Sequence, residues 1–342
     1  MANFVGTTGI DKIFGTELAD YIVGMAGADS LAGGDGDDVI QGGDDNDRIF
    51  GENGNDTING SRGADAIDGG TGDDLLQGGD GGDSIRGGLG NDTVEGGSGN
   101  DSLWGEGGND VINGGTGNDV IHGHDASDIL FGGADNDTLY DGLGDDYVDG
   151  GSGDDDFFAG GGNDYFQGGS GFDTLSFAGQ AQGIVADLSK HLVTGADTSE
   201  VWSVEKLVGT SFDDVMKGDK SANALVGGGG DDELRGLGGV DTLTGGQGHD
   251  TFVFLAKDVF GTDGAHLGVD VITDFTSSDT INLHDLHKDN SVALDDTFQF
   301  TKVEGGTMIQ ALVGDAFVDI VLLQGINGGL ASAWASDGML VA

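Results

Sequence analysis

Gly69-Gly70-Thr71-Gly72-Asp73-Asp74-Leu75-Leu76 is one copy of a nine-residue pattern that runs without a break in phase from Asp11 to Asp173. Nineteen aspartates occupy every ninth position of this stretch, and an apolar residue follows each of them two positions later. Most of these aspartates follow a glycine-rich loop, as in Gly114-Gly115-Thr116-Gly117-Asn118-Asp119. A short, fixed period of this kind predicts a solenoid in which each repeat stacks on a neighbour.

An all-β fold follows from the length of the repeat. Nine residues are too few for a repeat that contains a helix, and they suit a three-residue strand followed by a six-residue turn. Side chains alternate between the faces of a strand, so the middle residue of each strand points inward. Two repeats make one turn of a flattened parallel solenoid, and nineteen repeats give about nine turns over roughly 45 Å at the usual strand spacing.

A second block of the same pattern covers residues 209–254. Its register positions are Asp214, Asn223, Asp232, Asp241 and Asp250. Asp173 and Asp214 lie 41 residues apart, which is not a multiple of nine. Residues 177–208 are therefore predicted to form a separate β insert after the first block, residues 6–176. Residues 255–342 carry no nine-residue register, and alternating apolar runs such as residues 316–323 predict a compact β-rich domain.

The composition points to a cation as the main partner. The chain has 342 residues, with 72 glycines, no proline and no cysteine, and its formal net charge is −50. Such a chain is expected to repel nucleic acid and anionic membranes. The lack of cysteine excludes disulfides and thiolate metal sites, and no segment approaches the roughly 18 apolar residues of a membrane span. Residues 1–6 have neither a basic nor an apolar stretch, so we expect no cleavable secretion signal there.

The aspartate register favours calcium over other metal ions. Stacking places an aspartate above an aspartate on each edge, which is repulsive without a counterion. Ca²⁺ takes about six to eight oxygen ligands, whereas Mg²⁺ demands strict octahedral geometry and Zn²⁺ prefers His or Cys. Turn propensity alone would explain the abundance of Gly and Asp, although not nineteen aspartates in one register. We expect the chain to be largely unfolded without calcium and to fold when calcium binds.

The repeats resemble the RTX, or haemolysin-type, calcium-binding motif GGxGxDxUx, in which U is apolar. The resemblance implies a parallel β-roll in two blocks, followed by a small β-rich C-terminal domain. It also implies about fifteen or more Ca²⁺ ions between turns, bound by carboxylates and loop carbonyls. The implied aspartate ligands are Asp29, Asp38, Asp47, Asp56, Asp65, Asp74, Asp83, Asp92, Asp101, Asp110, Asp119, Asp137, Asp146, Asp155, Asp164, Asp173, Asp232, Asp241 and Asp250. The implied loop glycines are Gly33, Gly36, Gly69, Gly72, Gly96, Gly99, Gly114, Gly117, Gly227, Gly229 and Gly245.

Several repeats depart from this motif, and the sites beside them are expected to be weak or empty. Leu18 replaces a glycine before Asp20, and residues 123–128 have lost two glycines. Asp141 and Ala159 stand where the first glycine of the loop belongs, and Asn223 replaces the aspartate itself.

The C-terminal part resembles that of serralysin-type secreted proteases in residues 171–177, 250–254 and 270–275. In that family the region is an uncleaved signal for type I secretion, and the acidic-then-apolar ending at residues 337–342 is compatible with it. An ordinary end of a β-domain is the alternative. The resemblance implies a secreted, extracellular or surface-associated protein that partners the type I secretion machinery. Low cytosolic calcium would keep the chain unfolded for export.

No sequence pattern for catalysis is found. The segment His284-Asp285-Leu286-His287 has the wrong spacing for a zinc protease and lacks its glutamate, and no Gly-x-Ser-x-Gly elbow occurs. His122, His124 and His249 are expected to face solvent. The three tryptophans at positions 104, 202 and 334 are predicted to be scattered, without forming a stacking platform.

Three classes of function remain. A non-enzymatic, calcium-binding structural, surface or matrix protein is favoured, with extracellular polysaccharide as a possible partner. The second class is a carbohydrate- or ice-binding adhesive solenoid, although the regular threonine rank that ice binding requires is nearly missing. The third is the calcium-dependent folding or secretion module of an enzyme or membrane-active toxin.

Overall fold

The computed structural model describes residues 2–260, 267–283, 294–313, 316–326 and 339–341. Two compact units divide the chain. Unit 1 consists of Met1–Thr174 with Trp202–Val204, and unit 2 of Leu175–Val201 with Glu205–Ala342. The sequence motif at residues 284–287 and the tryptophan at position 334 lie outside the described residues, as does most of the ending at residues 337–342.

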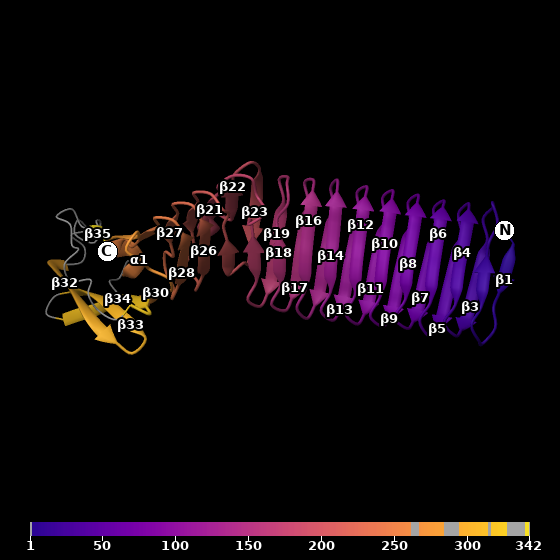
Figure 1. The fold of residues 1–342 in the computed structure, drawn as a ribbon, viewed down its shortest axis with the longest axis horizontal. Coiled ribbons are helices and arrows are strands. Elements are labelled where there is room, and N and C mark those ends of the chain that lie inside the picture. The colour runs from indigo at the N-terminus through magenta and orange to yellow at the C-terminus, as the bar shows by residue number, and fades with distance from the viewer. Residues whose placement is uncertain (1, 261–266, 284–293, 314–315, 327–338, 342) are drawn as a thin grey trace. The chain divides into compact units, whose positions relative to one another are not determined.

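Unit 1 is a stack of short parallel strands (Figure 1). Its strands are β1 (Asn3–Val5), β2 (Lys12–Phe14), β3 (Tyr21–Ala26), β4 (Ser30–Asp35), β5 (Val39–Asp44), β6 (Arg48–Asn53), β7 (Thr57–Arg62), β8 (Ala66–Thr71), β9 (Leu75–Asp80), β10 (Ser84–Leu89), β11 (Thr93–Ser98), β12 (Ser102–Gly107), β13 (Val111–Thr116), β14 (Val120–Asp125), β15 (Ile129–Ala134), β16 (Thr138–Leu143), β17 (Tyr147–Ser152), β18 (Asp156–Phe158) and β19 (Tyr165–Ser170). Even-numbered strands pair with even-numbered ones, and odd with odd. Each turn therefore contains two repeats, as predicted.

The pairing offset in unit 1 is 18 residues. Ile67 of β8 lies beside Ile85 of β10, and Gly70 lies beside Gly88 in the same ladder. The ladder thus includes the glycines that follow the apolar residue, so most strands are six residues long and the turns between them three. The prediction of three-residue strands with six-residue turns was wrong, because it treated the glycines as turn residues without ladder hydrogen bonds.

The core of unit 1 is a single file of apolar side chains along each sheet. Ile22, Leu76 and Leu103, each two residues after a motif aspartate, have no exposed surface. Their neighbours on either side in the strand point outward, which gives the alternating burial expected of a strand. One inward side chain per repeat, as the sequence predicts, closes the space between the two sheets.

Unit 2 begins with the segment predicted as an insert. Its elements are β20 (Thr174–Ser176), β21 (Val185–Asp187), the 3₁₀ turn η1 (Leu188–Lys190), β22 (Leu192–Thr194), β23 (Thr198–Trp202), β24 (Lys206–Val208), β25 (Val215–Lys217), β26 (Ala224–Gly229), β27 (Glu233–Arg235), β28 (Thr242–Gln247), β29 (Thr251–Val253), α1 (Ala256–Val259), β30 (Asp270–Ile272), β31 (Thr280–Asn282), β32 (Leu294–Val303), β33 (Gly306–Val313), β34 (Ala316–Gln324) and β35 (Met339–Val341). Thr174 of β20 and Trp202 of β23 are assigned to unit 1, and the other residues of these two strands to unit 2.

The roll of unit 2 is longer than the block at residues 209–254. β21 pairs in parallel with β25, and β24 pairs in parallel with β26, so residues 177–208 supply the first strands of this roll. At the other end β30 pairs with β28 and β31 with β29, again in parallel. The prediction that residues 255–342 carry no register was therefore wrong for residues 270–282, because the register resumes there after an insertion.

The last described strands form an antiparallel layer. β32 pairs with β33 and β33 with β34, and β34 in turn joins β30. The strand predicted at residues 316–323 is confirmed as β34. An all-β fold, a parallel β-roll followed by a β-rich C-terminal region, is thus confirmed. Among the described residues no helix has the length and apolar character to cross a membrane.

Candidate metal centre

From Asp20 to Asp173, each motif aspartate of unit 1 accepts a main-chain hydrogen bond from the turn before it. The main-chain N–H of Asp56 donates to Oδ1 of Asp74 at 2.7 Å, and that of Asp65 donates to Oδ1 of Asp83 at the same distance. The step of 18 residues repeats to the bond between the N–H of Asp155 and Asp173 Oδ1 at 3.0 Å. Two ladders of aspartates result, one on each edge of the roll. Within them, no aspartate from Asp20 to Asp173 exposes more than 4% of its surface.

The second carboxylate oxygen of most of these aspartates is buried without a donor. Oδ2 has no hydrogen-bond partner among the described residues in Asp29, Asp38, Asp47, Asp56, Asp65, Asp74, Asp83, Asp92, Asp101, Asp110, Asp119, Asp128, Asp137, Asp146, Asp155, Asp232 and Asp241. Leaving a charged group buried and unpaired is far more costly than leaving a neutral one. A regular row of such oxygens therefore needs a proton or a cation, because the side chains of the described residues supply no donor.

The first glycine of each loop keeps the space beside this oxygen clear of side chains. A Cβ on Gly69 would lie 2.4 Å from Oδ2 of Asp74 and 2.6 Å from the carbonyl oxygen of Gly87. The predicted glycines Gly33, Gly96, Gly114, Gly227 and Gly245 have the same surroundings on the carboxylate side. A carboxylate oxygen and a carbonyl oxygen thus both approach the first glycine so closely that no side chain fits at this position.

The other predicted glycines have a different place in the loop. Gly36, Gly72, Gly99 and Gly117 have φ between 106° and 126°, the left-handed region that favours glycine. A Cβ on Gly72 would lie 2.1 Å from the carbonyl oxygen of Gly54. These glycines turn the chain and do not touch the carboxylate. Gly229 has room for a side chain, its nearest neighbour lying 3.7 Å away, so it does not belong to this cradle.

Burial raises the pKa of the ladder carboxyl groups. The pKa values of Asp74, Asp83 and Asp137 rise to about 7, with loss of hydration as the main cause and the aspartates of adjacent turns as a further one. The hydrogen bond from the main-chain N–H of the preceding turn lowers the pKa of each of these groups.

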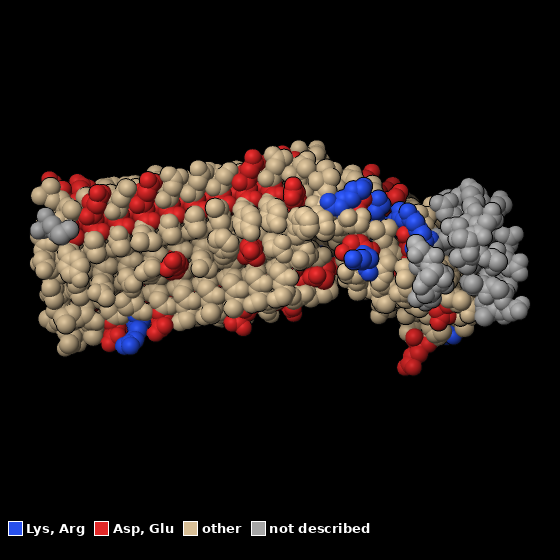
Figure 2. Space-filling view, turned by 180° about the vertical axis from the view of Figure 1, so that it is seen from behind, with Lys and Arg blue, Asp and Glu red and all other residues tan. Residues whose placement is uncertain are grey.

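The surface of unit 1 is acidic. Among its described residues, Arg62 and Arg86 form ion pairs with carboxylates at the surface. On the face shown in Figure 2, acidic side chains form a long row on unit 1.

The donor set fits calcium. Every ligand atom offered by the cradle is an oxygen, from a carboxylate or a main-chain carbonyl, and such hard donors suit Ca²⁺ and not Zn²⁺. The orphaned Oδ2 atoms, which lack a hydrogen-bond donor, are what a bound cation needs. The motif aspartates and the carbonyls of the first glycines would hold it.

Comparison with known families identifies the repeat. The sequence model described as RTX calcium-binding nonapeptide repeat (4 copies) matches overlapping segments that begin at 5–40 and continue to 140–175, and two more at 204–234 and 218–252. These segments cover more than half of the chain. The chain belongs to the RTX calcium-binding repeat family. No curated protein matches it.

The RTX ladder of unit 2 ends at two residues that the sequence pattern missed. Main-chain N–H groups link Asp214 to Asp232 and Asp232 to Asp250, and that of Asp250 donates to Oδ1 of Asp279 at 3.1 Å. On the other edge the N–H of Asp241 donates to Oδ1 of Asp270 at 2.9 Å. Asp270 and Asp279 are nine residues apart and each precedes a buried isoleucine by two positions, Ile272 and Ile281. That spacing was the signal that would have found them.

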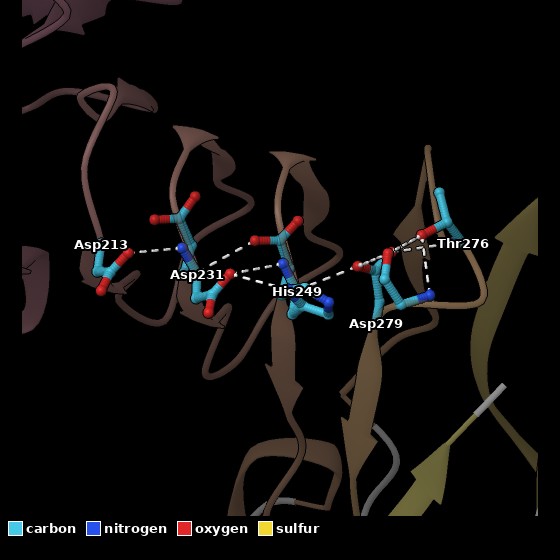
Figure 3. A network of polar contacts seen from close by, with 8 residues as sticks. Asp213, Asp231, His249, Thr276 and Asp279 are labelled. Carbon is cyan, nitrogen blue, oxygen red and sulfur yellow. Dashed lines mark hydrogen bonds and ion pairs between the residues drawn. The ribbon is translucent and has the colours of Figure 1, made fainter.

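A second row of hydrogen bonds joins the residues that directly precede many of the ladder aspartates, and Figure 3 shows it in unit 2. The N–H of Asp231 donates to Oδ1 of Asp213 at 2.8 Å, and the N–H of His249 donates to Oδ1 of Asp231 at 2.9 Å. Asn55 and Asp73 are joined in the same way in unit 1. The frequent asparagine before the motif aspartate therefore links turns.

Near the start of each unit, a threonine supplies the hydrogen-bond donors that Oδ2 lacks in the regular repeats. In unit 1 the N–H and hydroxyl of Thr16 both donate to Oδ2 of Asp20, at 2.8 Å each. Thr210 holds Asp214 of unit 2 through the same two groups, at 2.7 and 3.2 Å. Thr7 and Asp11 repeat the arrangement. These aspartates are satisfied within the chain, so the threonines act as caps of the RTX ladder.

Trp104 belongs to a stack of rings in unit 1 that it forms with other aromatic residues and not with another tryptophan. On adjacent even-numbered strands Trp104, His122, Tyr140 and Phe158 stack in one column, with ring centroids 5.9, 4.4 and 4.6 Å apart. Arg86 extends the column, its guanidinium lying 5.4 Å from the centroid of the Trp104 ring. The residues are 18 apart, so they share a face only because two repeats make one turn. Each inner ring is covered by its neighbours, so the column stabilises stacking of the turns.

Proposed function

We propose that this RTX protein is a secreted structural solenoid that folds when it meets extracellular calcium and has no enzymatic activity. The observation that supports it is the row of buried Oδ2 atoms without a hydrogen-bond donor. Calcium is the partner that such oxygens lack, and it binds the folded turns better than the open chain. A ligand that binds only the folded state stabilises that state by mass action.

Folding would depend on calcium because the apolar core is thin. Only one side chain per repeat, such as Ile85, is buried between the two sheets, whereas nine backbone residues lose their conformational freedom. The stacked aspartates add electrostatic repulsion. Neutralising the carboxylates is then the condition for a stable roll.

Export would exploit the same dependence. In a cytosol poor in free calcium the chain stays open, and it folds outside, where calcium is abundant. We propose a type I route that reads the C-terminal part, on the basis of its resemblance to the serralysin-type ending. A fusion of residues 255–342 to a reporter should be exported by cells with a type I exporter and retained by cells without one. Equal export from both strains would contradict this route.

A structural or matrix role outside the cell fits the long acidic row of unit 1 (Figure 2). Polysaccharide at the cell surface remains the proposed partner, reached through calcium bridges. The aromatic column does not favour binding by ring stacking, because the faces of His122 and Tyr140 are covered by their neighbours.

A calcium titration of the purified chain tests the central proposal. Circular dichroism should change from an open chain in chelator to β structure in calcium, with a steep midpoint, and magnesium at equal concentration should not replace calcium. Light scattering in the same samples would detect association of the folded rolls. A β spectrum that is the same in chelator and in calcium would sink the proposal.

A further inference from the structure

Asp141 stands where other turns of unit 1 carry the first glycine of the loop. At Gly132, one repeat earlier, a Cβ would lie 2.5 Å from Oδ2 of Asp137 and 2.6 Å from the carbonyl oxygen of Gly150. At Gly123, one turn earlier, it would meet Oδ2 of Asp128 and the carbonyl oxygen of Asp141 itself. Asp141 thus brings a side chain into the space that the ladder carboxylates face.

The carboxylate of Asp141 is buried and only half satisfied. The residue is 1% exposed. Its Oδ1 accepts hydrogen bonds from the N–H groups of Gly142 and Gly160, at 2.7 Å each. Its Oδ2 has no partner among the described residues, and neither has Oδ2 of Asp146. Two orphaned carboxylate oxygens therefore occur in one repeat, where the regular repeats have one.

A third carboxylate completes the group. Asp141, Asp146 and Asp164 each offer an oxygen within 4.8 Å of the others, and no other acidic trio in the described part of the chain comes as close. All three are buried. Loss of hydration raises the pKa of Asp141 well above its ordinary range, and repulsion from Asp164 and Asp146 raises it further.

The strand ladder is interrupted at the same place. β18 ends at Phe158, and beyond it a single bridge joins Leu143 to Gly161. The N–H of Asp146 donates to Oδ1 of Asp164 at 3.1 Å, longer than the 2.8 Å or less of the preceding steps on this edge. The turn is therefore built around the extra carboxylate and differs from its neighbours in backbone pairing.

We propose that Asp141, Asp146 and Asp164 bind one Ca²⁺ ion through three side-chain carboxylates, and that this site fills before the regular sites of unit 1. The inference deepens the proposed calcium function and rests on it. Calcium affinity rises with the number of charged ligands, and here a third carboxylate is added to a site of oxygens only. Asp141, which the motif comparison marks as a weakening substitution, becomes the ligand that distinguishes this turn.

The test is equilibrium dialysis of the full chain at rising free calcium, with bound calcium counted by atomic emission. The variants are D141G, which restores the usual glycine, and D141N, which keeps the shape and removes the charge. D149N is the control, because Asp149 lies on the outward side of β17 and its loss changes the net charge equally. Circular dichroism at saturating calcium checks that each variant folds. If D141G does not fold, the test rests on D141N alone.

Wild type and D149N should take up one ion at a free calcium about tenfold below that which fills the remaining sites. In D141G and D141N this first ion should bind with the rest. A first step that persists in folded D141N would overturn the inference, and so would a wild-type chain that fills all its sites together. A wild-type chain that binds no calcium at all would instead overturn the proposed function, whatever the variants do.

Discussion

The main-chain N–H of Asp74 donates a 2.8 Å hydrogen bond to Oδ1 of Asp92, one turn further along the chain. Each carboxylate therefore has two separate duties. Oδ1 joins the turns through the backbone, while Oδ2 faces the cradle of the first glycine, here Gly87. The two duties can be separated by mutation.

Replacing Asp92 by Asn should keep the hydrogen bond between the turns and abolish the binding of the cation. The amide oxygen of D92N can still accept from Asp74, but its NH₂ group cannot bind a cation. We expect folding to need more calcium, with little change in β content at saturation. D92A should lose both duties and cost about 1–3 kcal/mol more, because a buried N–H is left without an acceptor. Identical calcium midpoints for wild type and D92N, measured by circular dichroism, would contradict the assignment of Oδ2 to calcium.

Protons should compete with calcium for the ladder. The folded pKa of Asp83 is raised to about 7, above the unfolded value near 4. The protonated form therefore stabilises the calcium-free roll below about pH 4, and this stability is lost as the pH rises through about 7. More β structure is expected in chelator at pH 5 than at pH 8. Because protons occupy the same oxygens, the midpoint of calcium binding, measured by equilibrium dialysis, should move to higher concentrations between pH 8 and pH 6. Light scattering must exclude precipitation, since the isoelectric point is near 4.1. A midpoint independent of pH would argue against these carboxyl groups as ligands.

The first glycine should tolerate no side chain. In G69A the new methyl group would lie 2.4 Å from Asp74 Oδ2 and 2.6 Å from a carbonyl oxygen, so we expect a loss of about 1–3 kcal/mol and weaker calcium binding. G107A is the matched control. Its Cβ would lie 3.4 Å from Leu89, in ordinary contact, and the change should be neutral or slightly stabilising. Chemical denaturation in saturating calcium compares the two, and equal stabilities would contradict the steric reading.

The threonine cap of unit 2 should work without calcium. T210V removes the hydroxyl that bonds Asp214 and should cost about 1–3 kcal/mol. T57V, on an outward strand position of unit 1, should change stability by less than about 0.5 kcal/mol. T210G recreates the glycine of the usual loop, so calcium can bind there. High calcium should therefore restore part of the stability that this variant loses. Hydrogen exchange of the Ile184 amide, which bonds Asp214 Oδ1, reports on this turn. A loss in T210G that calcium does not reduce would count against the cap as a substitute for the ion.

The nine-residue register predicted most of the roll because each position of the repeat carries one type of residue with one structural role. Ile85 and the other apolar partners had to point inward, and the aspartates had to stack once two repeats were assigned to a turn. The strand length was not predictable in the same way. Glycines such as Gly70 join the ladder only because the adjacent turn presents Gly88 in register, which is a property of the stack and not of the repeat.

The residues that were missed show where the nine-residue pattern is not sufficient to predict the structure. Asp270 and Asp279 keep the aspartate-to-isoleucine spacing, but 29 residues separate each from its partner in place of 18. Burial of Asp141 depends on its neighbours one turn away. The column from Trp104 to Phe158 is visible in the sequence only at a spacing of 18.

Alternation of successive repeats between two sheets also determines how such a chain can change its length. Removing 18 residues from the middle of unit 1 would delete one complete turn and leave every downstream side chain on its original sheet. Removing nine would transfer all downstream residues to the opposite sheet, so that Tyr140 would no longer lie in line with Trp104. Gene duplication or deletion is therefore expected to act on pairs of repeats, and an engineer lengthening the roll should insert the pair as the module.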